Sequence, residues 1–361
     1  MSIILSEVRV EFPVTLVTGS TGKIGGAVVD QLLRRGVPVR ALVRTADARS
    51  RALAARGADV RLGDLFDQSS LAAAMAGTDR AVYCAPFHPD AQKAAEAFAQ
   101  AAEAEKVAHV VSLSQWLASP HHPSPLTRHH WFADRRFSAI AGATHTIVAP
   151  GFFADNYLRL IGFAAQLGVL PSLTGDSRNA PPSNEDIARV IVGALLNPKA
   201  WAGAHLRPTG PALLSTADMA QVLSNVLGRS VRRVEMPLWL FLKAARLQGV
   251  SAFELSGFRH YIRDHAQGAF AHGAPTDHVE RVTGSPPESF AAIAARYAQR
   301  DAARRSVSMV ASAWFDFMRT PMMPGINLEQ FDRKAGTLAP ADSRYAMEDA
   351  EWRQTRLAIA C

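Results

Sequence analysis

The chain has 361 residues, of which 48% are hydrophobic and 20% are charged. This balance excludes an intrinsically disordered chain and allows one large α/β unit with an appendage. The formal net charge is +7, and only six of the 39 basic residues are lysine. Because the arginines are scattered along the chain rather than clustered, we predict no nucleic-acid partner.

The cysteine content and the length of the apolar runs indicate where in the cell the protein is located. The two cysteines, Cys84 and Cys361, cannot form a disulfide framework, which favours a reducing cytoplasm. The first twelve residues lack the basic start and the long apolar core of a signal peptide. Apolar stretches such as 158–170 are shorter than the roughly 20 residues that a membrane span needs. We therefore expect a cytoplasmic protein with no membrane partner.

The first part of the chain alternates short β-branched runs with alanine-rich stretches of helical periodicity. Strands are predicted at 14–17, 37–43, 60–62, 80–85, 109–113 and 144–148. Helices are predicted at 23–35, 48–56, 69–75, 90–106 and 131–140. This regular βα order predicts a doubly wound parallel sheet with helices on both faces, the Rossmann type of α/β fold, over residues 1–150.

The pattern changes after Pro150 and Gly151. Loops rich in proline and glycine then separate helical stretches from short strand-like runs. We predict a smaller α+β lobe on the substrate side, residues 151–297, and a C-terminal helical extension, residues 298–361. The extension carries an apolar stripe at helical spacing that includes Trp314, Phe315 and Met318. Three roles stay open for it: a cover over the active site, packing on the core, or a homodimer contact.

Three glycines, Gly19, Gly22 and Gly25, stand between the first predicted strand and the first predicted helix. Such a turn brings backbone N–H groups and a helix N-terminus against a pyrophosphate. A glycine pattern alone is weak evidence, and an ordinary glycine-rich loop is the alternative, but the flanking elements favour a dinucleotide site. The expected contacts come from Gly19, Ser20, Thr21, Gly22, Lys23, Ile24 and Gly25.

The end of the second strand indicates which dinucleotide is bound. NAD-binding chains usually carry a carboxylate there for the ribose 2′-OH. This chain has Arg44 and no carboxylate before Asp47. A guanidinium can hold the 2′-phosphate of NADP as a paired ion, so we predict NADP(H); a solvated residue at a strand end is the alternative. Asp64 and Leu65 follow the third strand, where the carboxylate either accepts from the adenine amino group or lies in a surface turn.

These segments together resemble the NmrA-like family of atypical short-chain dehydrogenases/reductases. The resemblance covers about residues 14–297 and rests on VTGSTGKIG at 17–25, VRALVR at 39–44, GDL at 63–65, VVSLS at 110–114 and PGFFADN at 150–156. It implies a nicotinamide lined by the ends of the fourth and fifth strands, where this chain has Ala85, Pro86 and Ser112. The family also includes catalytically silent NADP sensors, so the resemblance does not settle the activity.

The chain departs from the wider short-chain dehydrogenase pattern at the proton donor. No Tyr-x-x-x-Lys pair follows the fifth strand, and Ala149 replaces the arginine that the family commonly has before Pro-Gly. Relatives that reduce quinones or imines often carry Lys or His with an acidic residue four positions later, which corresponds here to His130 and Asp134. That spacing puts both side chains on one helix face, so we expect Asp134 to orient His130 as a proton donor. A local polar pair at a helix start is the alternative.

The expected substrate side is aromatic. Trp116, Trp131, Phe152, Phe153 and Tyr157 lie on segments expected above the nicotinamide. They favour a pocket for a small apolar substrate, with plain core packing as the alternative. Ser114, at the end of the fifth strand, is expected either to hydrogen-bond a substrate carbonyl or to shape the loop.

Two other kinds of chemistry are not supported by the sequence. The neighbouring histidines His121, His122, His129 and His130 have no carboxylate or cysteine at a matching ligand spacing, so no metal site is predicted. Cys84 lies in an apolar strand and is expected in the core rather than as a nucleophile.

Two functions follow from these features. The first is an NADPH-dependent reductase that transfers hydride to an apolar carbonyl, enone, imine or quinone. The second is a catalytically silent NADP(H)-sensing protein that binds a regulatory partner. The missing Tyr-x-x-x-Lys pair favours the second, whereas His130, Asp134 and the aromatic segments favour the first. We expect the enzyme.

Overall fold

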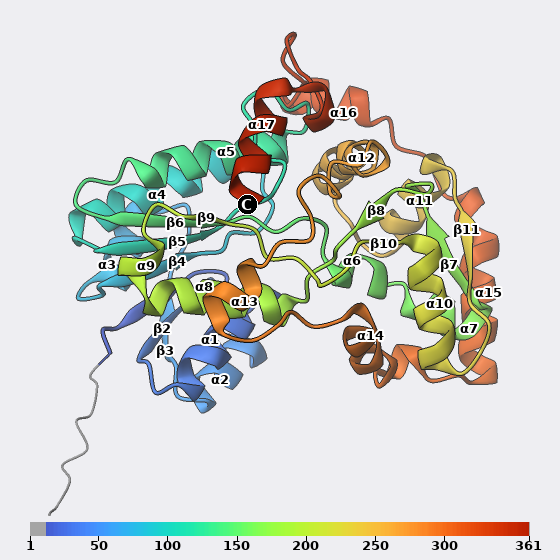
Figure 1. Ribbon diagram of the computed structural model, residues 1–361, viewed down its shortest axis with the longest axis horizontal. Helices are drawn as coiled ribbons and strands as arrows, with labels where there is room; N and C mark the ends of the chain where they lie inside the picture. The colour runs from blue at the N-terminus through green and yellow to red at the C-terminus, as the bar shows by residue number, and fades with distance from the viewer. Residues whose placement is uncertain (1–11, 361) are drawn as a thin grey trace, which may run out of the picture.

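The computed structural model describes residues 12–360 (Figure 1). Residues 1–11, where no signal peptide is predicted, and Cys361 lie outside the described residues. Within the described part, no helix has both the length and the apolar character that crossing a membrane requires.

A seven-stranded parallel sheet organises the first half of the chain, in the order β3-β2-β1-β4-β5-β6-β9. Its strands are β1 (Thr15–Val17), β2 (Val39–Val43), β3 (Asp59–Leu62), β4 (Arg80–Tyr83), β5 (His109–Leu113), β6 (Thr144–Val148) and β9 (His205–Leu206). The first six strands follow the doubly wound order, and the direction of winding reverses between β1 and β4. The predicted Rossmann fold is confirmed, and this reversal is where such sheets bind ligands.

Helices cover both faces of this sheet (Figure 1). One face packs against α1 (Lys23–Arg34), α2 (Ala48–Ala55), α8 (Asn184–Leu196) and α13 (His278–Thr283). The other packs against α3 (Gln68–Met75), α4 (Ala91–Ala104) and α5 (Pro125–Ser138). The strand pleat divides the apolar residues between the two cores, because Val17 faces α1 whereas its neighbour Leu16 faces α4.

A third core lies beyond the carboxyl edge of the sheet. It is built around Leu158, Leu223 and Ile293. Its elements are α6 (Ala154–Leu158), α7 (Ile161–Leu167), β7 (Val169–Ser172), α10 (Thr216–Leu227), β11 (Arg232–Glu235) and α14 (Phe290–Ala298). Next to it lie β8 (Arg178–Asn179), β10 (Leu214–Ser215), α11 (Leu238–Leu247) and α12 (Ala252–Ala266). This part matches the predicted α+β lobe.

The sequence predicted boundaries at residues 150 and 297, but the chain does not divide at these positions. After the Pro150–Gly151 break the chain returns to the seven-stranded sheet. Strand β9 joins this sheet, and α8, α13 and the short α9 (Pro198–Trp201) pack on the same side of it as α1. The predicted extension divides as well. Helix α15 (Val307–Arg319) lies on α7 and α16 (Leu328–Ala335) lies on α12, whereas α17 (Ala350–Ala360) returns beside α5 and β9 (Figure 1).

Candidate active site

The glycine turn is held against the end of β4. Gly19 has a φ of +60°, and a Cβ at this position would lie 2.1 Å from the carbonyl oxygen of Cys84. A Cβ on Gly25 would lie 2.3 Å from the Gly19 carbonyl oxygen, so α1 approaches the turn more closely than any side chain allows. Both positions therefore require glycine, as the sequence predicted.

A cavity of about 400 Å³ opens beside this turn, at the point where the winding reverses. It brings together most of the predicted cofactor residues: Gly19, Thr21, Gly22, Arg44, Asp64, Leu65, Ala85 and Pro86. Gly22 is the N-cap of α1 and makes no side-chain capping bond, so the first N–H groups of α1 have no side-chain acceptor. An uncapped helix N-terminus beside a glycine turn fits a pyrophosphate.

The charges around the cavity favour an anion. Arg44 is exposed at the end of β2 and lines the cavity. The nearest carboxylate on α2, Asp47, caps that helix and forms an ion pair with Arg49 at 2.7 Å. Asp64 also lines the cavity, and its carboxylate accepts from the Phe66 N–H at 3.0 Å, so it shapes the turn as well. Arg44 therefore lines the cavity, and its contact with the 2′-phosphate stays a prediction.

Five predicted cofactor residues do not line this cavity: Ser20, Lys23, Ile24, Gly25 and Ser112. The Ser20 hydroxyl is buried and donates to the Leu42 carbonyl at 2.7 Å, which fixes the turn to β2. Ile24 faces the sheet and packs into the core. Ser112 points into the α5 layer, because it lies within β5 rather than after it. Ser20, Ile24 and Ser112 support the site from behind.

Lys23 connects the turn to the second lobe. Its ammonium lies 2.7 Å from the carboxylate of Asp155 at the start of α6, and the Tyr297 hydroxyl donates to the same carboxylate. Burial opposes ionisation of Asp155, yet the hydrogen bonds from Lys23 and Tyr297 lower its pKa overall. The sequence placed Lys23 in the cofactor site but did not reveal this contact, because its partner is 132 residues away.

Lys23→Met is expected to cost less than about 1 kcal/mol of folding free energy, because the lysine side chain is 60% exposed. The loss should be largest near neutral pH. A lowered carboxylate pKa contributes stability above its unfolded value and loses it as the pH falls through the folded one. Urea unfolding at pH 7 and pH 3 checks this, with Lys199→Met as the control for an exposed lysine that makes no ion pair within the described residues. Equal losses at both pH values contradict it.

The predicted bond between His130 and Asp134 does not form. Both residues lie on α5, but Asp134 accepts from the Ser114 hydroxyl at 2.5 Å, and the Ser112 oxygen lies 3.3 Å from its other carboxylate oxygen. Asp134 turns toward the sheet, where its carboxylate meets Ser112 of β5 and Ser114, which directly follows that strand. The His130 ring instead lies edge-on to Phe87, with centroids 6.4 Å apart. The site therefore pairs Asp134 with Ser114.

The ionisation of these two residues differs from the expected roles. Burial lowers the pKa of His130 to about 4, so its imidazole is neutral near pH 7. Burial raises the pKa of Asp134 to about 7, although the hydrogen bond from Ser114 opposes this. The carboxyl group of Asp134, rather than the His130 imidazole, can hold a transferable proton at neutral pH.

The predicted substrate aromatics divide into different surroundings. Trp116 is fully buried with the Arg207 guanidinium over its ring, so it belongs to the core rather than to a pocket. Trp131 lines a separate cavity on the α17 side of α5. Phe153 packs against the core beneath α1. Tyr157 is buried and its hydroxyl bonds to His265 Nε2 at 2.5 Å, so its role is structural.

Phe152 belongs to an aromatic cluster that the sequence did not reveal. Its ring lies 5.8 Å from Phe258 and 5.7 Å from Phe270, and the Tyr261 ring lies 6.2 Å from Phe270. The Tyr261 hydroxyl donates to the side chain of Gln115, the residue after Ser114. Phe258 and Tyr261 come from α12, three residues apart, and this spacing was the available signal. The cluster adjoins the β5 edge at Ser114.

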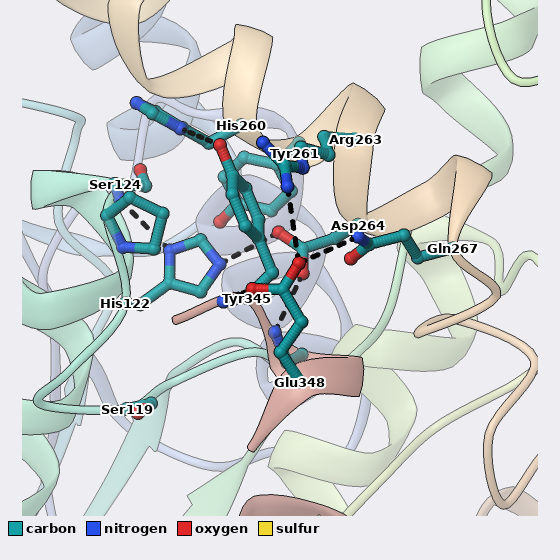
Figure 2. Close-up of polar contacts among 12 residues, drawn as sticks. Ser119, His122, Ser124, His260, Tyr261, Arg263, Asp264, Gln267, Tyr345 and Glu348 are labelled. Carbon is teal, nitrogen blue, oxygen red and sulfur yellow. Dashed lines mark hydrogen bonds and ion pairs between the residues drawn. The ribbon is translucent and has the colours of Figure 1, made fainter. Parts of the chain in front are cut away.

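A buried polar cluster fastens α12 in this position (Figure 2). His122 Nε2 lies 2.8 Å from an Asp264 carboxylate oxygen, and both side chains are fully buried. The other Asp264 oxygen accepts from the Ala346 N–H at 3.1 Å. Tyr345 bonds to His260 at 2.9 Å, and the Arg263 guanidinium lies over its ring. The loop after β5, α12 and the C-terminal segment are therefore joined at one point.

Cys84 is a free thiol in an apolar environment, and burial raises its pKa to about 11. Its side chain packs against the core on the α1 side of the sheet. A thiol with a raised pKa is a poor nucleophile. Cys84 packs against the core as predicted, but it is half-buried and also lines the cofactor cavity.

The fold and the glycine turn define an NAD(P)H-binding protein of the doubly wound type. Residues 19–198 match the NAD(P)H-binding family model. An NAD(P)H azoreductase of Xenophilus azovorans is 33% identical over 290 residues, which cover 78% of this chain and 97% of that protein. The chain belongs to the NmrA-like family of atypical short-chain dehydrogenases/reductases, and its class is that of the NAD(P)H-dependent oxidoreductases.

Solved structures show the same fold. The NADPH-dependent quinone oxidoreductase of Escherichia coli in complex with NADPH has a TM-score of 0.68 at 22% identity, covering 78% of this chain and 99% of that one. NmrA, a negative transcriptional regulator solved with NAD, has a TM-score of 0.61 at 16% identity, covering 79% of this chain and 95% of that one. At these identities the likeness concerns the fold alone.

Proposed function

We propose that this protein is an NADPH-dependent reductase of apolar conjugated acceptors, such as a quinone, enone, imine or carbonyl compound. The observation that carries the proposal is the position of the aromatic cluster around Phe152, Phe258 and Tyr261. It lies at the same sheet edge as the cofactor turn and Ser114. The names of the azoreductase and the quinone oxidoreductase add support, because their acceptors are conjugated.

Each part of the site has a separate role in binding NADPH or the acceptor. The turn at Gly19 and the α1 N-terminus hold the pyrophosphate, and Arg44 pairs with the 2′-phosphate. NADPH, when bound, supplies the hydride. Ser114 lies at the end of β5, and when Asp134 is protonated and donates to the Ser114 oxygen, the Ser114 hydroxyl can donate to the heteroatom of the acceptor that becomes negative. His130, with a neutral imidazole beside Phe87, contributes to the wall of the site.

The direct test is the loss of NADPH absorbance with a panel that contains a benzoquinone, an azo dye, an enone, a cyclic imine and an aryl ketone. Turnover of at least one conjugated acceptor, with aliphatic alcohols and NADP⁺ inactive or slow, is the expected result. Tight NADPH binding without turnover of any acceptor would instead favour the silent sensor.

We propose further that the protein is a homodimer joined through α15. One face of this helix exposes Val307, Trp314, Phe315 and Met318, and Met322 continues it. Together these side chains offer on the order of 600 Å² of apolar surface, near the ~800 Å² per partner of stable interfaces. Asp316 and Arg319 pair with each other at 2.9 Å, so the face has no free charge. An uncharged apolar face suits a second copy better than a charged partner.

Phe315→Asp is expected to convert the dimer to a monomer while leaving NADPH affinity unchanged. Light scattering after size-exclusion chromatography measures the mass. Leu62→Asp is the matched control, since Leu62 is 63% exposed and Phe315 is 64% exposed. A wild-type protein that is monomeric at micromolar concentration contradicts the proposal.

A further inference from the structure

We propose that Asp134 carries protons from a cavity behind α5 to the Ser114 hydroxyl, so that the acceptor is protonated from the rear of the sheet. This inference rests on the proposed reductase function. It concerns the route by which a proton enters the site, whereas the cofactor and the acceptor enter at the sheet edge.

The cavity lies between α5 and α17 and has a volume of about 460 Å³. Trp131, Asp134, His205 and Arg356 are among its lining residues. Asp134 therefore has the cavity on one side and Ser114, at 2.5 Å, on the other. Since Ser114 directly follows β5, one carboxyl group separates this cavity from the active-site edge.

A chain of hydrogen bonds through Ser138, His145 and Ser112 lies beside the Asp134 carboxyl group. The exposed Ser138 hydroxyl donates to the Asp134 carbonyl at 2.8 Å, so its oxygen is left to accept from His145 Nδ1 at 3.0 Å. His145 Nε2 then accepts from the Ser112 hydroxyl at 2.8 Å. The Ser112 hydrogen is therefore engaged by His145, and the Ser114 hydroxyl, 2.5 Å from Asp134 Oδ2, is left to exchange a proton with the carboxyl group.

The charged and titratable neighbours of Asp134 determine the pKa of its carboxyl group. Arg356 faces it from α17 but donates to the His205 ring and to the Ala118 carbonyl, so the guanidinium is held in other bonds. His205 on β9 and His145 on β6 are neutral, because burial lowers the pKa of both. His130, one turn earlier on α5, is neutral as well. Burial outweighs the attraction of Arg356 and raises the pKa of Asp134 to about 7.

The proton balance of the step is complete. Hydride adds to the acceptor and leaves a negative charge on its heteroatom, which takes the proton from Ser114 as that O–H bond breaks. The Ser114 oxygen takes the proton of Asp134, and the carboxylate takes up one proton from bulk solvent through the cavity. Overall, NADPH, one proton and the acceptor give NADP⁺ and the reduced acceptor.

The experiment compares Asp134→Asn with the wild type across pH 5.5–9, using the acceptor found active. The wild-type kcat should fall as the pH rises through about 7, because the acid form is lost. The isosteric variant should lose about 100-fold in kcat and show no such fall, with the KM for NADPH unchanged. Glu351→Gln changes another carboxylate on the same cavity and should leave kcat unchanged.

Two further measurements distinguish a failure of the proton relay from a failure of the proposed reductase function. Infrared difference spectra of the protein without cofactor should show the Asp134 carboxylic acid band at pH 6, absent in Asp134→Asn; an ionised group at pH 6 overturns the relay. Thr355→Trp should fill the cavity and slow kcat without changing the KM for NADPH. Wild-type protein without turnover overturns the proposed function itself. Turnover and a pH profile that survive in Asp134→Asn overturn the relay alone.

Discussion

Arg44→Asp is expected to weaken NADPH binding by about 100-fold while changing NADH binding by less than about threefold. Arg44 is exposed at the end of β2 and lines the cofactor cavity, whereas the nearby Arg49 is already paired with Asp47. The substitution replaces an attractive charge with a repulsive one only where the 2′-phosphate binds. Titration of both dinucleotides by calorimetry gives the two dissociation constants.

Arg51→Asp is the matched control. It makes the same change of charge on α2, but Arg51 does not line the cavity. Its effect should be small and equal for both dinucleotides, since it acts only through long-range electrostatics. If Arg44→Asp weakened NADPH and NADH equally, the 2′-phosphate would lie elsewhere and the preference for NADP(H) would lose its basis.

Asp264→Ala is expected to lower the free energy of unfolding by about 3–5 kcal/mol, because it leaves a buried partner without its hydrogen bond. Asp264 is the point at which His122 and the Ala346 N–H meet, with no solvent to replace either bond (Figure 2). The reason for the large effect is therefore burial rather than charge. Guanidinium unfolding followed by circular dichroism measures the loss.

The neighbouring pair of His121 and Asp342 provides the control. These side chains also join the loop after β5 to the C-terminal segment, at 2.7 Å, but they are 40% and 63% exposed. Asp342→Ala should therefore cost less than about 1 kcal/mol. Similar losses for both variants would show that the His122–Asp264 bond is no stronger than a surface contact.

The sequence predicted what local chemistry dictates. The strand, glycine turn and helix around Gly19 are contiguous, and their requirements are steric, so they could be inferred without any tertiary information. The doubly wound parallel sheet followed from the βα alternation, whereas its seventh strand, β9, was not predicted as part of it. Arg44 was predicted as a cavity residue because the end of β2 has a fixed place in this type of sheet.

What the sequence could not give depends on contacts between distant segments. The spacing of His130 and Asp134 predicts a shared helix face, but not that this face turns toward Ser114. Trp116 was expected above the nicotinamide because nothing local indicates that Arg207 would cover its ring. The return of α17 to the first sheet depends on Trp352, which is 236 residues along the chain from its partner Trp116.

The surroundings of Trp116 give the protein an optical reporter of its own conformation. The Arg207 guanidinium lies 3.6 Å from the centre of its ring, and Trp352 of α17 lies edge-on at 5.9 Å. Both tryptophans are buried, whereas Trp131, Trp239 and Trp314 are exposed to solvent. The fluorescence emission of a buried indole differs from that of a solvent-exposed one. The packing of α17 against the rest of the protein can therefore be followed by intrinsic fluorescence without a label.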